Sequence, residues 1–91
     1  MKEKTLHKGD NQKSESVKHT LILYNDEVNN FDYVIKSLIE ICGHDSVQAE
    51  QCALIVHLKG SCDIKLGIRE ELQAMSLSLN AKGLNSQVKS L

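Results

Sequence analysis

Proline and tryptophan are absent from this chain, and its 91 residues include one phenylalanine and two tyrosines. So few aromatic side chains leave little with which to line a large cofactor cavity. The familiar catalytic patterns are missing too, because there is no glycine-rich phosphate loop and no nucleophile elbow. The sequence therefore favours a binding protein over an enzyme, and no cofactor is expected.

Clustered basic residues and long apolar runs are also missing. The 11 Lys and Arg are scattered among 12 Asp and Glu, which gives a net charge of -1. Nucleic-acid binding relies on grouped cations that displace counterions, so nucleic acid is not an expected partner. No apolar run approaches the roughly 20 residues that span a bilayer, and the N-terminus lacks the apolar stretch of a signal peptide. We expect a cytoplasmic protein that does not enter membranes.

The three cysteines, Cys42, Cys52 and Cys62, are an odd number for a chain with this expected location. Each takes an apolar position of its segment, so they are interpreted as small core residues. A zinc site made of Cys42, His44, Cys52 and His57 is an alternative. Structural zinc usually takes paired ligands about two to four residues apart, which this chain lacks, so no metal is expected.

The composition divides the chain into a polar N-terminal segment and one compact domain. Residues 1–17 are mainly Lys, Glu, Ser, Asn, Gln and Gly, with almost nothing to bury. Ordering them would cost conformational entropy without a compensating core, which predicts a flexible extension. It is either a frayed terminus or a tether that binds a partner. Residues 18–91 are close to the smallest size at which a single core suffices.

Three segments have the pattern of β-strands. Residues 19–24 are rich in strand-forming side chains, with Leu21 and Leu23 expected on one face. Residues 62–68 alternate between apolar and polar side chains, which predicts one buried face. The closing segment, residues 86–91, is a shorter and weaker strand pattern. The side chains expected on the buried face of the second strand are Cys62, Ile64, Leu66 and Ile68.

Three further segments repeat apolar residues at helical spacing. The first is capped by Asn29 or Asn30 and ends at Gly43. The second begins at Asp45 and ends at Gly60. The third has acidic residues in its first turn and a glycine after its last turn, as the helix dipole and capping preferences favour. The three apolar stripes are Phe31, Val34, Ile35, Leu38, Ile39 and Cys42; Ala49, Cys52, Ala53, Ile55 and Val56; and Leu72, Met75 and Leu79.

These segments give the order strand, helix, helix, strand, helix, strand. A chain of 91 residues with this order has room for one small sheet. The order favours an α+β fold in which a three-stranded antiparallel sheet carries three helices on one face.

The first strand ends abruptly in a polar run, residues 25–30. Within it, Asp26 offers a negative charge and Asn25 an amide oxygen beside the apolar start of a helix. A primary ammonium has three donors, and His57 at the end of the second helix could supply a third acceptor through a neutral ring nitrogen. Two simpler interpretations stay open. The polar run is also typical of a loop that caps its own backbone, and His57 of a residue that interacts with the last helix carbonyls.

The segment LILYNDEVNNFDYVIKSLIEICGHDSVQAEQCALIVHLKG, residues 21–60, resembles the core of the ClpS adaptor family. The family pattern is an apolar strand, an Asn-Asp-Asp motif or close variant, a helix, and a second helix that closes in Val-His-x-x-Gly. The resemblance extends over residues 19–91 and is strongest up to Gly60. The matching residues are Asn25, Asp26 and Glu27 for the acidic motif, and Val56, His57 and Gly60 for the helix end.

The resemblance implies an adaptor that captures substrates with a bulky apolar N-terminal residue and delivers them to a Clp AAA+ unfoldase. In the family, the Asn, the first Asp and the His hold the substrate's α-amino group, so these roles pass to Asn25, Asp26 and His57. Glu27 takes the second acidic position and is carried over as an accessory acceptor, together with Asn29. Residues 1–17 correspond to the family's N-terminal extension, which takes part in delivery.

The chain departs from the family pattern at the walls of the implied pocket. The family usually has Thr-Pro-Met after the acids, where this chain has Asn29, Asn30 and Phe31. A bulky residue commonly gates the pocket from the second helix, and the matching position is Ala53. Phe31 is expected to narrow one wall and Ala53 to widen another, with Val34 also lining the pocket. The preference among Leu, Phe, Tyr and Trp should change accordingly.

A second departure concerns the surface that the family turns to the unfoldase. Glu70 matches the family's Glu, but Met75 stands where a Lys commonly follows five residues later. The expected partner is the N-terminal domain of a ClpA- or ClpC-like unfoldase. Two alternatives remain open: an interaction domain of the same fold with another client, like the C-terminal domain of the bacterial ribosomal stalk protein, and a metal-binding or redox protein that uses the cysteines.

Overall fold

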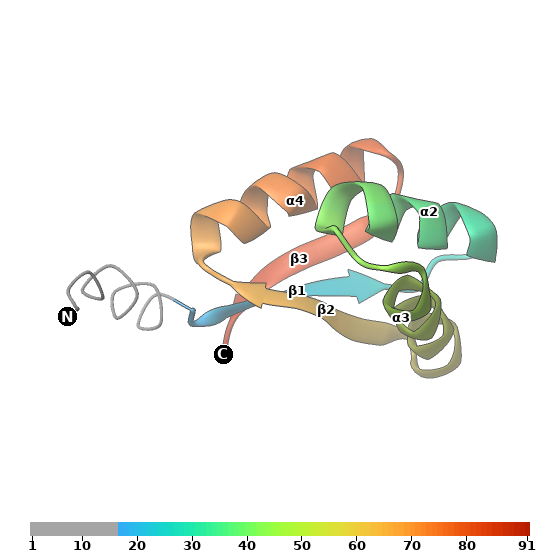
Figure 1. The fold of residues 1–91 in the computed structure, drawn as a ribbon, viewed down its shortest axis with the longest axis horizontal. Coiled ribbons are helices and arrows are strands. Elements are labelled where there is room, and N and C mark those ends of the chain that lie inside the picture. Colours follow the sequence, from blue (N-terminus) through green and yellow to red (C-terminus); the bar gives the residue numbers. More distant parts are fainter. Residues whose placement is uncertain (1–16) are drawn as a thin grey trace, which may run out of the picture.

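The computed structural model of the chain describes residues 17–91, which form a three-stranded sheet and three helices (Figure 1). Most of the predicted N-terminal extension, residues 1–16, lies outside this described part. The α+β prediction is confirmed, including the order of the elements. The strands are β1 (His19–Tyr24), β2 (Ser61–Gly67) and β3 (Asn85–Ser90), and the helices are α2 (Phe31–Cys42), α3 (Ser46–Lys59) and α4 (Arg69–Ala81).

β1 is the central strand, and β2 and β3 pair with it antiparallel on its two sides. Leu21 and Leu23 point to the same face of β1, and both are fully buried there. Helices α2 and α4 run side by side over the sheet, while α3 packs against β2 and α2 (Figure 1). The central strand therefore supplies the middle of the core, and its end leads directly to the loop before α2.

The core consists almost entirely of aliphatic side chains, as a chain poor in aromatic residues requires. Burying each large aliphatic side chain stabilises the fold by about 1.5–3 kcal/mol. The buried hydrophobic residues come from every helix, from the two strands β1 and β2, and from the turn before β3. They are Leu21, Leu23, Leu38, Cys42, Ala49, Val56, Ile64, Leu72, Leu79 and Leu84.

The predicted boundaries of the first two helices are confirmed. The side chains of Asn30 and Asp45 each accept a hydrogen bond from the backbone N–H three residues on, at 2.8 Å and 2.7 Å. Gly43 and Gly60 end these helices in the left-handed conformation, with φ of 71° and 94°. The second of these ends fixes where α3 stops, one turn beyond His57.

The prediction that Leu66 lies on the buried face of its strand is wrong. The pairing of β1 with β2 skips Ile64, so that this strand carries one extra residue, a β-bulge. A shift of one residue exchanges the two faces of a strand. Leu66 is therefore 58% exposed. Lys65 instead pairs with the buried Leu21, and its Nζ donates to the carbonyl of Cys42 at 3.0 Å.

The three cysteines are free thiols that pack in or against the core, as predicted. Burial raises the pKa of Cys42 to about 11 and that of Cys62 to about 12. Within residues 17–91, no three His, Cys, Asp or Glu side chains gather closely enough to hold a metal ion. None of the helices in this part of the chain is both long and apolar enough to cross a membrane.

Candidate functional site

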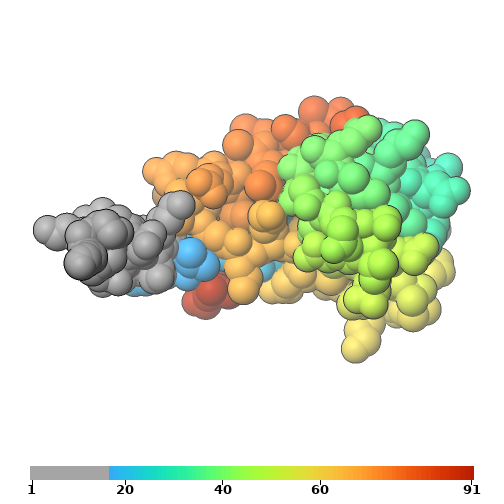
Figure 2. Space-filling view, in the orientation of Figure 1, coloured from blue at the N-terminus to red at the C-terminus, as the bar shows by residue number. Residues whose placement is uncertain are grey.

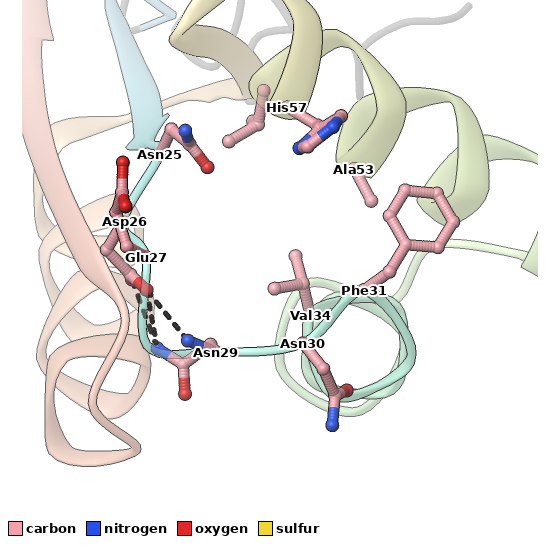
Figure 3. Close-up of a pocket in the computed structure, with 10 residues that line it drawn as sticks. Asn25, Asp26, Glu27, Asn29, Asn30, Phe31, Val34, Ala53 and His57 are labelled. Atoms are coloured by element: carbon pink, nitrogen blue, oxygen red, sulfur yellow. Dashed lines mark hydrogen bonds between the residues drawn. The ribbon is translucent and has the colours of Figure 1, made fainter.

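A cavity of about 550 Å³ opens between the loop that follows β1, the start of α2 and the second half of α3 (Figure 3). Every residue that the sequence predicted to hold or line a substrate site contributes to its wall. Glu70, predicted to contact an unfoldase, lies apart from it at the exposed start of α4. The lining residues are Asn25, Asp26, Glu27, Asn29, Asn30, Phe31, Val34, Ala53, Val56 and His57.

Asn25 and His57 form one rim of the cavity, although 32 positions separate them in the sequence. The backbone N–H of Asn25 donates to the carbonyl of Gly60 at 2.9 Å, which ties the end of β1 to the end of α3. This bond places the Asn25 amide and the His57 ring on the same side of the opening, both facing the cavity (Figure 3). The left-handed Gly60 is thus a positioning element of the site as well as a helix end.

Asp26 organises the loop of residues 25–30, which we call the pocket loop. Its Oδ1 accepts from the backbone N–H groups of Val28 and Asn29, both at 2.9 Å. Its Oδ2 accepts from the side-chain amide of Asn29 at 3.0 Å. The backbone N–H of Asn29 is the main cause that lowers the pKa of Asp26. Burial, the next largest effect, raises this pKa, and the Asn29 side-chain amide and the Val28 N–H lower it further. The carboxylate is therefore negative at neutral pH, but much of its accepting capacity serves its own loop.

Glu27 also lines the cavity and is exposed. Within residues 17–91, its carboxylate has no hydrogen bond or ion pair that would occupy its oxygens. The pocket loop thus carries two negative charges with different environments. Asp26 is held by backbone donors, whereas the Glu27 oxygens remain available to a ligand.

Two side chains fasten the pocket loop and the first turn of α2 to the turn between α4 and β3, residues 82–84. The Asn29 amide donates to the carbonyl of Gly83 at 2.9 Å, and the Tyr33 hydroxyl donates to the carbonyl of Lys82 at 2.7 Å. The Lys82 ammonium lies 3.3 Å from the Glu40 carboxylate of α2. Sequence reasoning missed this attachment, because no pattern relates Asn29 to a turn 54 positions later.

The apolar wall of the cavity comes from both helices. Ala53 and Val56 are buried on α3, Val34 is half-buried on α2, and Phe31 is 41% exposed at the start of α2. Figure 3 shows the Phe31 ring beside Ala53, on the side of the cavity away from Asn25. A large side chain on α2 thus stands next to a small one on α3. Val56 was expected in a helix stripe and in the motif at the helix end, but not as part of the cavity wall.

Met75, predicted to stand where a Lys is common in the family, is half-buried and packs against the core. It therefore presents little surface to a partner. Glu70 is exposed in the first turn of α4, where the helix dipole favours an acidic side chain. Of these two positions, only Glu70 has its side chain free to face another protein.

The same fold occurs in a solved structure, that of Agrobacterium tumefaciens ClpS2 bound to L-phenylalaninamide. The two structures superimpose with a TM-score of 0.78 at 15% sequence identity, over 82% of this chain and 99% of the other. No curated protein sequence gives a significant match. The family model for the ATP-dependent Clp protease adaptor protein ClpS matches residues 14–88. The chain belongs to the ClpS family.

Proposed function

We propose that the cavity binds the free N-terminus of a polypeptide whose first residue is bulky and apolar, and that the protein delivers such substrates to a Clp AAA+ unfoldase. The observation that carries this proposal is the convergence of an amide, an imidazole and two carboxylates on the rim of one apolar-walled cavity. An ammonium group needs hydrogen-bond acceptors on several sides, and an apolar side chain binds against apolar residues that exclude water.

In this site, Asn25 accepts from the substrate's ammonium through its amide oxygen, and His57 accepts through a neutral ring nitrogen. The carboxylates supply the charge. Because Asp26 already accepts from three donor groups of its own loop, Glu27 is the better candidate for direct contact, and Asp26 contributes charge and loop geometry. An internal peptide bond brings no positive charge, so the desolvated carboxylates would be left unpaired. The site thereby distinguishes chain ends from chain middles.

Phe31 and Ala53 set the size preference of the cavity. Ala53 leaves room on the α3 side, and the Phe31 ring stands beside it. Val34 and Val56 complete the wall. A planar first residue of the substrate can stack against the Phe31 ring, which favours Phe, Tyr and Trp over Leu. The cavity volume of about 550 Å³ is ample for any of them.

Asn29 is a positioning residue in this site. Its amide joins the Asp26 carboxylate to the carbonyl of Gly83, so it fixes the pocket loop against the body of the domain. Precise placement of the first residues in a site depends on such support. Asn29 thus acts on the ammonium through the loop rather than by direct contact.

Delivery uses parts of the chain outside the cavity. Glu70 on α4 contacts the N-terminal domain of a ClpA- or ClpC-like unfoldase, and residues 1–17 form an extension that takes part in handing over the substrate. Residues 18–91 are the adaptor domain itself. The protein works in the cytoplasm, has no catalytic role of its own, and needs no cofactor.

The first experiment is a titration of the full chain with fluorescent decapeptides that differ only in their first residue. Peptides that begin with Phe, Tyr, Trp or Leu should bind, and the Ala peptide should bind at least tenfold more weakly, since it leaves the apolar wall uncovered. Equal affinity for the Ala and Phe peptides would refute the proposed pocket. It would favour an interaction domain with a different client.

The second experiment tests delivery separately. A chain that lacks residues 1–16 should bind the Phe peptide with unchanged affinity but no longer promote degradation of a substrate that begins with Phe. The Glu70→Ala variant should also bind the peptide normally and bind the unfoldase domain more weakly. A loss of peptide affinity in either variant would contradict this division of roles.

A further inference from the structure

Helix α3 is apolar on two opposite sides. Its inner side carries the small residues Ala49, Ala53 and Val56, which are buried in the core or the cavity wall. The prediction that Ile55 belongs to this inner side is wrong, because it is 39% exposed. Large apolar residues instead gather on the outer side. They are Val47 at 61%, Leu54 at 47%, Ile55 at 39% and Leu58 at 69% exposed.

The outer residues follow the spacing of a coiled-coil seam. Val47, Gln51, Leu54 and Leu58 are separated by four, three and four positions, an average close to the 3.5-residue repeat of packed helices. We call these four positions the α3 seam. Three of them, all except Gln51, carry large apolar side chains. Figure 2 shows α3 on the outer surface of the molecule, with no other described element lying over it. Such a stripe is unusual on a solvent-facing helix.

We infer that the α3 seam is a docking surface for a second copy of this chain, packed through antiparallel α3 helices. The seam is self-complementary. A two-fold axis between Gln51 and Leu54 sets Val47 against Leu58 of the second copy, and Gln51 against Leu54 of the second copy. The same patch then serves both copies, as an isologous contact requires. Antiparallel helices also bring opposite ends of their dipoles together.

The polar side chains beside the seam favour the same arrangement. Glu50 and His57 lie on one flank of the seam, seven positions apart. The two-fold axis places Glu50 of each copy beside His57 of the other, so that each carboxylate can accept from the N–H of a neutral imidazole. No pair of like charges is brought together along the seam. A parallel arrangement would instead set Glu50 of each copy beside Ile55 of the other, which offers the carboxylate no donor.

Residues 1–16 are a poor alternative occupant of the seam. Met1 and Leu6 are their only large apolar side chains, too few to cover Val47, Leu54 and Leu58. In addition, β1 starts at the end of the sheet far from α3 (Figure 1). A second α3 supplies one large apolar residue for each one exposed.

The dimer should be weak. Helix α3 has 14 residues, about 21 Å, which allows two heptads of contact. An interface of that size falls below the roughly 1,200 Å² of stable complexes, and Gln51 in the seam lowers its stability further. The seam adjoins Ala53 and His57 of the cavity, so association takes place beside the opening without filling it.

Sedimentation equilibrium of the full chain under reducing conditions tests the inference. The wild type should show a reversible monomer-dimer equilibrium at concentrations up to about 1 mM, the range of weak association. Leu58→Lys should weaken association at least tenfold. Leu77→Lys is the matched control, because Leu77 is 70% exposed on α4 and lies outside the seam. It should leave association unchanged.

A Gln51→Leu variant separates a disrupted interface from a loss of fold as the reason why Leu58→Lys associates less. This variant should strengthen association at least tenfold, because it replaces the polar seam residue, and a merely unfolded protein would not form a tighter reversible dimer. A wild type that stays monomeric over the whole range would overturn the inference. So would equal effects of Leu58→Lys and Leu77→Lys, or a Gln51→Leu variant that associates no better than wild type.

Discussion

Asn29 donates its side-chain amide to the Asp26 carboxylate at 3.0 Å and, through the same nitrogen, to the carbonyl of Gly83 at 2.9 Å. One side chain thus links the pocket loop at the cavity rim to the turn that follows α4. This relationship joins the local geometry of the pocket loop to the packing of the whole domain. Single substitutions at these residues can therefore be used to measure peptide affinity and the pKa of Asp26 separately.

Asn29→Ala should weaken binding of a Phe-initiated peptide about three- to tenfold, because losing the amide leaves the loop less well placed. It should also raise the pKa of Asp26, since one of its donors is removed. NMR titration of the Asp26 carboxyl carbon measures the second effect directly. Tyr33→Phe, which breaks the neighbouring bond to Lys82, should leave the pKa of Asp26 unchanged. An unchanged titration in Asn29→Ala would remove Asn29 from this role.

The stability of the pocket loop should depend on pH in the acid range. The pKa of Asp26 is lowered below its ordinary value of 3.8 in the folded protein. Its carboxylate therefore stabilises the fold above that value, and this contribution is lost as the pH falls through the lowered pKa. Because Asp26 is only half-buried and solvent screens its interactions, the effect should be small. Urea unfolding at about pH 6 and pH 3 should show a smaller pH dependence for Asp26→Asn than for wild type.

Binding itself should weaken as the pH falls through the range in which histidine titrates. Protonation would convert the accepting nitrogen of His57 into a donor that faces the substrate's ammonium. His57→Gln keeps an acceptor but cannot titrate, so its affinity should vary less between about pH 8 and pH 5.5. Peptide titrations of both proteins at matched ionic strength make the comparison. Parallel profiles for the two proteins would show that His57 does not contact the ammonium.

The bulge in β2 should contribute measurably to stability through His44. This buried ring donates from Nε2 to the carbonyl of Ile64, the extra residue of the strand, at 2.8 Å. A carbonyl only accepts, so Nε2 carries the proton. His44→Ala should lower the free energy of unfolding by about 1–3 kcal/mol, because a buried carbonyl loses its donor and a cavity is left. Urea denaturation of both proteins measures this, and a change within about 0.3 kcal/mol would contradict it.

Cys42 and Cys62 should react slowly with thiol reagents in the native protein. Burial raises the pKa of Cys62 from 9.0 to about 12 and that of Cys42 to about 11, which leaves very little thiolate at pH 8. Alkylation by iodoacetamide, followed by mass spectrometry, should proceed on the order of a hundredfold more slowly in native than in urea-unfolded protein. Rapid native labelling of Cys62 would show that its surroundings are more open than the structure has them.

The size preference of the cavity is tested by exchanging the large and small residues of its wall. In the double variant Phe31→Ala with Ala53→Met, bulk moves from α2 to α3. We expect the ranking of Phe and Leu peptides to shift toward Leu, because the aromatic partner for stacking is lost. Competition titrations with both peptides give the ratio. A ratio that stays the same would mean that Phe31 does not contact the first residue.

The sequence predicted the elements whose signals are local. Asn30, Gly43 and Gly60 marked helix ends correctly, because capping depends on residues within one turn. Leu66 was misplaced, because a bulge is decided by pairing with a distant strand rather than by its own pattern. Ile55 was misplaced because α3 carries apolar residues on two opposite sides, so that spacing alone could not tell the inner side from the outer one.

The residues of the candidate site were predictable, but their interactions were not. The motif residues Asn25, Asp26 and His57 do meet at one cavity. The sequence could not indicate that backbone N–H groups occupy much of Asp26, since this depends on the conformation of the pocket loop. It also could not indicate the attachment of Asn29 to Gly83. Such long-range polar contacts have no periodic signature.

The most direct measurement of the central claim compares one Phe-initiated peptide with its N-acetylated form by calorimetric titration of the full chain. Acetylation removes the ammonium and leaves the side chain intact. The free peptide should bind at least about a hundredfold more tightly, because several charge-assisted hydrogen bonds are lost with the ammonium. Equal affinity for the two peptides would contradict recognition of a free N-terminus by Asn25, His57 and the carboxylates of the pocket loop.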